Sequence, residues 1–142
     1  MHVFLRDYYS LRVRTVDVTY ELKIIPNTRI ALSCWSGTID LKKRKENVRT
    51  MAQFCRDNGL SQLIVDTRQQ VDDATTMQMY DFGASIPEIM RGIQVAVVCR
   101  PSARATRFGE TVAANRGTNS HSFETIEEAK TWLAGNEGTL NS

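Results

Sequence analysis

The sequence predicts an α/β fold with a mixed, mostly parallel sheet of five strands, an N-terminal antiparallel hairpin and four helices. Two apolar runs carry this prediction: residues 63–66 (LIVD) and 93–99 (IQVAVVC) have the length and composition of strands buried on both faces. Segments with apolar residues at helical spacing lie between and after them. Such alternation of strands and helices favours right-handed crossovers and parallel pairing.

The N-terminal half predicts a hairpin followed by a helix. Residues 18–24 are rich in β-forming residues, residues 26–28 (PNT) form a turn, and residues 29–36 form the second strand. The short turn makes this pair antiparallel. The helix begins at Asp40, which is a suitable N-cap, and ends at Gly59, which suits the C′ position.

This first helix has one apolar stripe and several charged positions. The stripe comprises Leu41, Val48, Met51, Ala52 and Cys55, and the other faces carry Lys42, Lys43, Arg44, Lys45, Glu46 and Arg49. The basic run 42–45 is interpreted as a solvated face, with contact to an acidic partner, nucleic acid or lipid surface as the alternative. With a net charge of +2 and no interleaved aromatic residues, the sequence gives no strong nucleic-acid signal.

The C-terminal half alternates strands with helices. The expected strands are residues 62–66, 93–99 and 122–123. The expected helices begin at Asp72 or Asp73, at Ser102, and at a capping box formed by Thr125 and Glu128. Pro87 stops the first of these helices or begins a new short turn, in which Ser85 and Glu88 fit a capping box.

A length of 142 residues predicts one domain. We place it at residues 17–134, preceded by an N-terminal arm or extra edge strand at 1–16 and followed by a flexible tail at 135–142. No run is long enough for a transmembrane span, and the charged N-terminus is unlike a signal peptide. The odd set Cys34, Cys55 and Cys99 indicates a reduced, cytoplasmic setting.

Three segments give the sequence a family resemblance. They are LIVD at 63–66, VAVVCR at 95–100 and SFETIEEAKTWL at 122–133. In this order the chain resembles small stand-alone bacterial members of the STAS superfamily (sulfate transporter and anti-sigma-factor antagonist, SpoIIAA-like) over residues 18–134. The resemblance implies a compact STAS-like domain that binds a partner protein or a small anionic or lipidic ligand.

The resemblance also implies a phosphorylation site, from which this sequence departs. In the anti-sigma antagonists, a serine just past an aspartate, near the start of a helix, is phosphorylated. Asp66 matches that aspartate, but the serine is missing and the loop is longer. Thr67, Thr75 and Thr76 are only loose substitutes.

The polar residues that follow two buried strands form the candidate binding site, because ligands and partners usually meet an α/β sheet at its carboxyl ends. The group consists of Asp66, Thr67, Arg68, Arg100, Ser102, Arg104 and Arg107. Arginines beside a helix N-terminus favour phosphate, carboxylate or sulfate. The alternative is that Arg68 and Arg100 pair with Asp66, Asp72 or Asp73 and merely shape the rim.

The second helix has apolar residues on more than one side. Met77, Met79, Tyr80 and Phe82 are the candidate interface residues. A homodimer contact or a lipid-facing cleft explains the excess, and so does a wide core stripe.

Catalytic signals are weak. His2 and His121 lack ligand spacing, so we expect no metal site, and no cofactor-binding motif occurs. Cys99 before Arg100 is the one candidate for an activated thiol. We therefore expect a non-enzymatic binding or regulatory module. The alternative is a small lipid or acyl-ligand carrier with an apolar cleft beside the helix at 73–90, and an enzyme ranks third.

Overall fold

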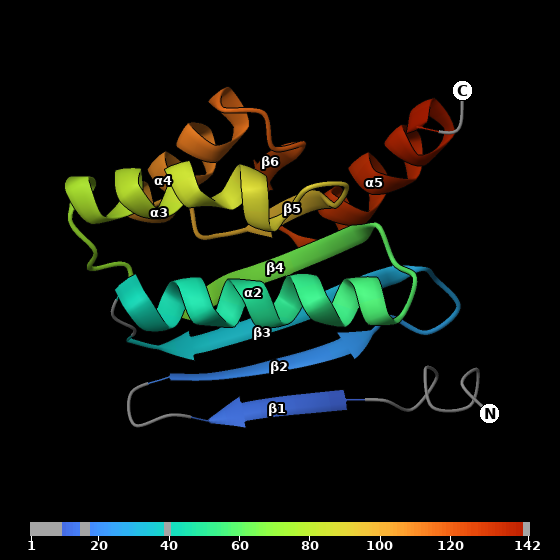
Figure 1. Ribbon diagram of the computed structural model, residues 1–142, viewed down its shortest axis with the longest axis horizontal. Coiled ribbons are helices and arrows are strands. Elements are labelled where there is room, and N and C mark those ends of the chain that lie inside the picture. Colours follow the sequence, from blue (N-terminus) through green and yellow to red (C-terminus); the bar gives the residue numbers. More distant parts are fainter. Residues whose placement is uncertain (1–9, 15–17, 39–40, 141–142) are drawn as a thin grey trace.

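The computed structural model of the protein describes residues 10–14, 18–38 and 41–140, which form one six-stranded sheet with helices on both faces (Figure 1). The strand order is β1-β2-β3-β4-β5-β6, so every strand pairs with its sequence neighbour. The strands are β1 (Ser10–Arg14), β2 (Val18–Ile24), β3 (Ile30–Gly37), β4 (Gln62–Gln70), β5 (Gln94–Val98) and β6 (Ser120–Phe123).

The first three strands pair antiparallel and the last four pair parallel. The predicted α/β class, the N-terminal hairpin and the mostly parallel sheet are therefore confirmed. All five expected strands are present, and β1 adds a further strand at the edge. Of the segment 1–16, residues 1–9 and 15–16 lie outside the described residues.

The helices of the described chain are α2 (Leu41–Asp57), α3 (Thr76–Ile89), α4 (Arg104–Asn115) and α5 (Ile126–Leu140). Asp40, the expected cap of α2, lies outside the described residues. Gly59 has a φ of +64°, the left-handed conformation expected of a C′ glycine. No described helix is long and apolar enough to cross a membrane.

Two helix boundaries differ from the sequence predictions. Pro87 lies inside α3 rather than ending it. Because the helix ends at Ile89, the hydrogen bond that Pro87 cannot donate is confined to the last turn. Likewise α5 continues to Leu140, into the segment expected to be a flexible tail, because no proline ends it and extending a formed helix is easy.

The sheet separates two apolar cores. On β4, Leu63 and Ile64 point to opposite faces and both are fully buried. The core on one face includes residues of α2, α3 and α4, and the core on the other includes Ala129 and Leu133 of α5. This arrangement explains the continuous apolar run of β4, since neither face of the strand meets solvent.

Helices α3 and α4 approach closely at two glycines. A Cβ atom added to Gly83 would lie 2.5 Å from the carbonyl oxygen of Gly109, and one added to Gly109 would lie 2.5 Å from Cε of Met79. Both distances are shorter than real contacts allow. The two helices can therefore lie this close above the sheet because glycine has no side chain at either position.

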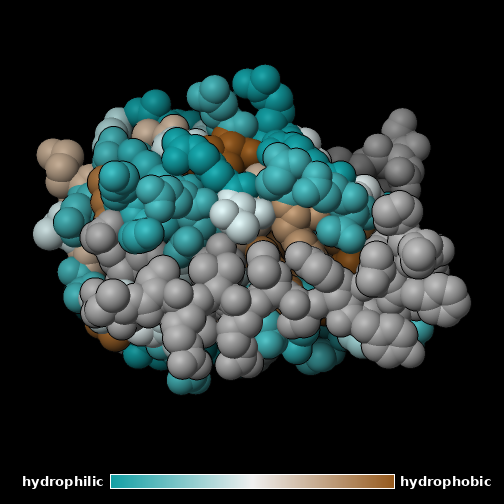
Figure 2. All heavy atoms as spheres, turned by 60° about the horizontal axis from the view of Figure 1, so that its bottom comes forward, coloured by the Kyte–Doolittle hydropathy of each residue, from teal (hydrophilic) through white to brown (hydrophobic). Residues whose placement is uncertain are grey.

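Figure 2 views the molecule from the β1 edge. The described residues on this face are mostly hydrophilic, and their apolar atoms appear in small, separate areas. The coloured part of this face is therefore typical of a surface in contact with water.

Candidate functional site

The carboxyl ends of β4 and β5 border a shallow depression, which we call the rim. It is lined by Arg68, Gln69, Gln70, Val71, Asp72, Arg100 and Ser102. The structure thus brings together three of the predicted site residues, Arg68, Arg100 and Ser102, across two neighbouring strands.

Asp66 and Arg68 form a two-pronged ion pair. Nε and Nη2 of Arg68 each donate to the Asp66 carboxylate at 2.9 Å, and the Arg68 backbone N–H donates to Oδ1 at 3.1 Å. The hydrogen bond to Asp66 is the main cause of the raised pKa of Arg68. Arg68 therefore pairs with Asp66, which was the alternative to anion binding, and the Asp66 carboxylate neutralises much of the Arg68 charge.

The strand β4 is longer than expected. The sequence predicted an end at Asp66, but pairing with β3 continues to Gln70 through a register shift between Cys34 and Ser36. The extension places Thr67 in the interior, where its hydroxyl donates to the carbonyl oxygen of Val98 at 3.0 Å. Thr67 is therefore not a rim residue.

The N-terminus of α4 is capped by Asp72 rather than by Ser102. The Asp72 carboxylate accepts hydrogen bonds from the backbone N–H groups of Ala105 and Thr106 at 3.1 and 2.9 Å, and from the Thr106 hydroxyl at 2.8 Å. Ser102 is exposed and contributes no cap. The backbone donors that favour an anion at this helix end already hold the protein's own carboxylate.

The N-cap of α3 also differs from the prediction, which was Asp72 or Asp73; the N-cap residue is Thr75. Thr75 forms a capping box with Gln78: the Thr75 hydroxyl accepts from the Gln78 N–H at 3.1 Å, and Gln78 Oε1 accepts from the Thr75 N–H at 2.8 Å. Thr75 and Thr76 are both exposed, unlike Thr67.

Three arginines form no ion pair with a described carboxylate: Arg100, which lines the rim, and Arg104 and Arg107, which lie in the first turn of α4 after it. Arg100 donates to the Gln70 carbonyl oxygen at 3.0 Å, Arg107 donates to the Pro101 carbonyl oxygen, and Arg104 is exposed. None of them is in an ion pair with another described residue. Together with the Asp72 carboxylate, which lines the rim, they leave an excess of positive side chains at and beside it.

The candidate interface on α3 divides into two groups. Met79 is buried and Phe82 packs against the core, as a wide core stripe requires. Met77 and Tyr80 are exposed by 75% and 43%. Arg116 lies over the Tyr80 ring at 5.3 Å and donates to its hydroxyl. Of these four side chains, Met77 and Tyr80 are therefore the exposed ones.

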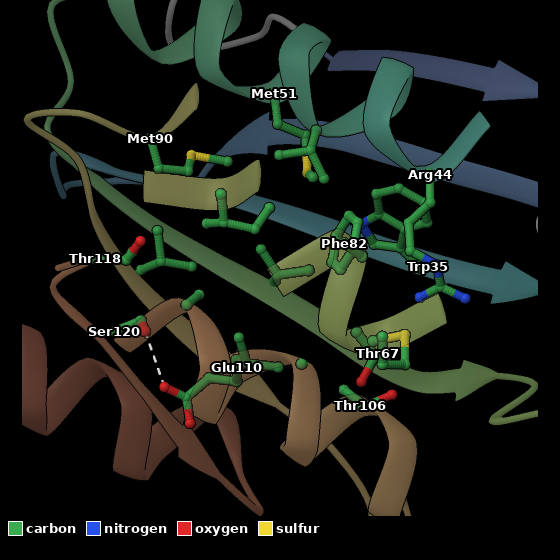
Figure 3. A pocket seen from close by; sticks show the side chains of 18 of the residues that line it. Trp35, Arg44, Met51, Thr67, Phe82, Met90, Thr106, Glu110, Thr118 and Ser120 are labelled. Atoms are coloured by element: carbon green, nitrogen blue, oxygen red, sulfur yellow. Dashed lines mark hydrogen bonds between the residues drawn. The ribbon is translucent and has the colours of Figure 1, made fainter. Parts of the chain in front are cut away.

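A cavity of about 80 Å³ lies between the sheet and helices α2, α3 and α4 (Figure 3). It lies beside α3, the helix next to which the sequence suggested an apolar cleft. Its walls are mainly apolar and include Trp35, Val48, Met51, Val65, Met79, Phe82, Ile86, Met90, Val95, Val97 and Ala113.

Arg44 lies at one end of this cavity and was wrongly assigned to a solvated face. It is only 6% exposed, its guanidinium lies 5.5 Å from the centre of the Phe82 ring, and the amide oxygen of Gln70, turned toward it, accepts from Nη1 and Nη2. Burial lowers the pKa of Arg44, while Asp72 and Asp73 act in the opposite direction. The spacing contained a signal, since Arg44 precedes Val48 by four residues and Met51 by seven.

Glu110, Ser120 and Thr118 lie along another part of the wall, at a distance from Arg44 in Figure 3. The Glu110 carboxylate accepts hydrogen bonds from the hydroxyls of Ser120 and Ser122, both at 2.8 Å. The Thr118 hydroxyl is buried and has no hydrogen-bond partner among the described residues.

The cysteines do not supply an activated thiol. Burial is the largest cause of the raised pKa of Cys99, and it raises the pKa of Cys55 to about 12. Both thiols are therefore protonated at neutral pH, so Cys99 lacks the thiolate that a nucleophile requires. Among the described residues, no group of three or more histidine, cysteine, aspartate or glutamate side chains is placed to hold a metal ion.

No protein-family model matches the sequence, and a search of curated proteins gives no match either. The fold is similar to a crystal structure of an anti-sigma factor antagonist from Mycobacterium paratuberculosis. The TM-score is 0.56 at 13% sequence identity, over 81% of this chain and 94% of that chain. The STAS-like fold implied by the sequence resemblance is therefore confirmed.

Proposed function

We propose that the protein is a non-enzymatic regulatory module that docks a partner protein at the rim. The observation that carries this proposal is the positive charge of Arg100, Arg104 and Arg107, which no described carboxylate neutralises in an ion pair. The similarity in fold to an anti-sigma factor antagonist supports a protein as the partner rather than a substrate.

The rim residues have different roles in this proposal. Arg100, Arg104 and Arg107 contact an acidic surface of the partner, where arginine suits bidentate pairing. Asp66 and Arg68 hold each other and shape the floor. Val71, exposed by 44%, lines the same depression and offers an apolar contact among the charges.

The test is a binding measurement with the partner purified in its own right after capture from cell extract. We expect the double variant Arg100→Ala/Arg104→Ala to bind at least tenfold more weakly, because two charge-assisted contacts are lost. The matched control is Lys42→Ala/Arg49→Ala, which removes two exposed cations from α2. Equal affinity of both double variants would contradict docking at the rim.

The exposed part of α3 supports a separate proposal of a homodimer through Met77 and Tyr80. Light scattering at micromolar concentration distinguishes one chain from two, and Met77→Glu is expected to abolish a dimer that uses this face. A monomeric wild type would contradict it.

We also propose a cytoplasmic location for the protein. The free thiols of Cys34, Cys55 and Cys99 support it.

The second candidate function is a carrier of a small ligand, favoured by the cavity beside α3. Native mass spectrometry of the purified protein tests it directly, because a retained ligand adds its mass to that of the chain. A carrier is expected to show such an adduct, or to acquire one when incubated with the ligand.

A further inference from the structure

Helices α3 and α4 expose apolar side chains that no other described part of the chain covers. Four large hydrophobic side chains are exposed among the described residues, and three of them belong to these two helices. Met77 and Tyr80 lie on α3, and Phe108, exposed by 37%, lies on α4. Single exposed apolar residues are common, but a group of them on neighbouring helices indicates a surface for a partner.

The apolar residues of the two helices lie level with each other. Helices α3 and α4 run in the same direction, because each follows one parallel strand and leads into the next. A Cβ atom added to Gly109 would meet both the side chain and the backbone of Met79, so these two residues are neighbours across the helix contact. The residues beside them along the helices are therefore level as well: Met77 and Tyr80 on α3, and Phe108 on α4.

A charged residue from each helix lies further along the same pair. Glu88 of α3 and Arg116, the C-cap of α4, are exposed and line one open groove. No ion pair joins them. Arg116 lies over the Tyr80 ring and donates to its hydroxyl, which makes the charged and apolar parts continuous. A guanidinium has five N–H donors, so this contact leaves others for a carboxylate.

The two helices carry opposite charges at the surface. The exposed charged residues of α3 are both acidic, and those of α4 and its C-cap are all basic: Asp81 and Glu88 on the first, and Arg104, Arg107 and Arg116 on the second. A surface that is acidic on one helix and basic on the next is complementary to a rotated copy of itself.

A two-fold axis parallel to the helices fits the apolar and the charged residues together. Such a rotation places α3 of one chain on α4 of the other, and every residue keeps its position along the axis. Met77 and Tyr80 then meet the partner's Phe108, and Glu88 meets the partner's Arg116. An axis across the helices would instead place α4 on α4, with basic side chains on both.

We propose that the protein forms a symmetric dimer in which α3 of each chain packs on α4 of the other, with Met77 and Tyr80 against the partner's Phe108 and Glu88 paired with the partner's Arg116. The proposal rests on the homodimer proposed above and adds α4 as the surface on which α3 packs. None of these residues lines the rim, so docking at the rim is tested separately.

The first test follows the apolar contact by light scattering over a range of protein concentrations. We expect a dimer for the unmodified protein and a dimer at least tenfold weaker for Phe108→Glu, because a carboxylate then replaces an apolar side chain in the contact. The matched control is Val71→Glu, which makes the same kind of change at the exposed hydrophobic residue of the rim and should leave the dimer unchanged.

The second test exchanges the charges of the proposed pair. Glu88→Arg leaves a chain with basic residues at both positions, and Arg116→Glu leaves a chain with acidic residues at both. We expect each variant alone to dimerise at least tenfold more weakly, because like charges then face each other. An equimolar mixture of the two variants is expected to form a heterodimer, since both pairs are restored between the chains. A contact within one chain cannot produce this rescue, because each chain still carries like charges. Circular dichroism checks that each variant is folded.

Each contrary result has a distinct meaning. A monomeric unmodified protein overturns this inference together with the homodimer proposed above. A dimer that Met77→Glu disrupts and Phe108→Glu leaves intact overturns the packing of α3 on α4, and leaves a dimer through α3 alone. A mixture of the two charge variants that stays monomeric overturns the pairing of Glu88 with the partner's Arg116.

Discussion

Single charged residues in this protein act across long distances in the sequence. Asp72 follows β4 yet caps α4, more than thirty residues later. Arg44 lies in a basic run yet is buried beside Phe82. In both cases the tertiary fold, rather than the neighbouring sequence, determines which groups the charged side chain contacts.

The capping role of Asp72 predicts a loss of stability. Asp72→Ala removes the acceptor of three hydrogen bonds at the start of α4, so we expect the free energy of unfolding to fall by about 1–2 kcal/mol. Urea unfolding followed by circular dichroism measures it. The control is Asp73→Ala, an exposed neighbour that should change stability by less than about 0.5 kcal/mol. Equal losses in the two variants would be inconsistent with the cap.

The buried thiol of Cys55 predicts a dependence of stability on pH. Its pKa is raised from 9.0 to about 12 by burial, so the unfolded chain releases this proton at a lower pH than the folded protein does. The stabilising contribution is complete below pH 9 and declines as the pH rises toward about 12.

The Cys55→Ala variant isolates this effect from other groups that titrate at high pH. We expect the stability advantage of the wild type over Cys55→Ala to shrink between pH 8 and pH 10.5 in urea unfolding. An advantage that stays constant over this range would show that Cys55 does not carry the raised pKa.

Among the secondary-structure elements, the contact between α3 and α4 depends most on residue size. A methyl group on Gly83 would overlap the Gly109 carbonyl oxygen, which is backbone and cannot rotate away. The two helices form part of the cavity wall, so their spacing affects that candidate site.

We expect Gly83→Ala to lower the free energy of unfolding by about 1–3 kcal/mol, although alanine is the better helix former. Chemical denaturation gives the value. The matched control is Gly135→Ala in α5, where an added Cβ meets no atom within 4 Å and stability should rise by up to about 1 kcal/mol. If Gly83→Ala also gained stability, the close approach of α3 and α4 would be wrong.

The elements that the sequence predicted well are those set by local pattern. The runs of β4 and β5, the stripe of α2 and Gly59 at its end follow from periodicity and turn chemistry. The cap of α4 by Asp72 depends on a contact between distant segments, which no local pattern contains. The end of β4 was misplaced for a similar reason, since β3 supplies partners up to Gln70.

At the scale of the whole molecule, two candidate sites share one part of the fold. The rim lies on the surface where β4 and β5 end, and the cavity lies between the sheet and helices α2, α3 and α4. Gln70 lines both, because its backbone carbonyl accepts from Arg100 while its side chain accepts from Arg44. Arg68 and Arg100 allowed the rim to be predicted from the sequence. The part of Arg44 in the cavity wall became clear only from its burial in the structure.

The central claim is that a partner protein docks at the rim, and hydrogen–deuterium exchange with and without that partner tests it most directly. We predict new protection of backbone amides in residues 68–73 and 100–107, with α5 unchanged. Protection confined to α5 or to the β1 edge, with the rim exchanging as in the free protein, would contradict the claim.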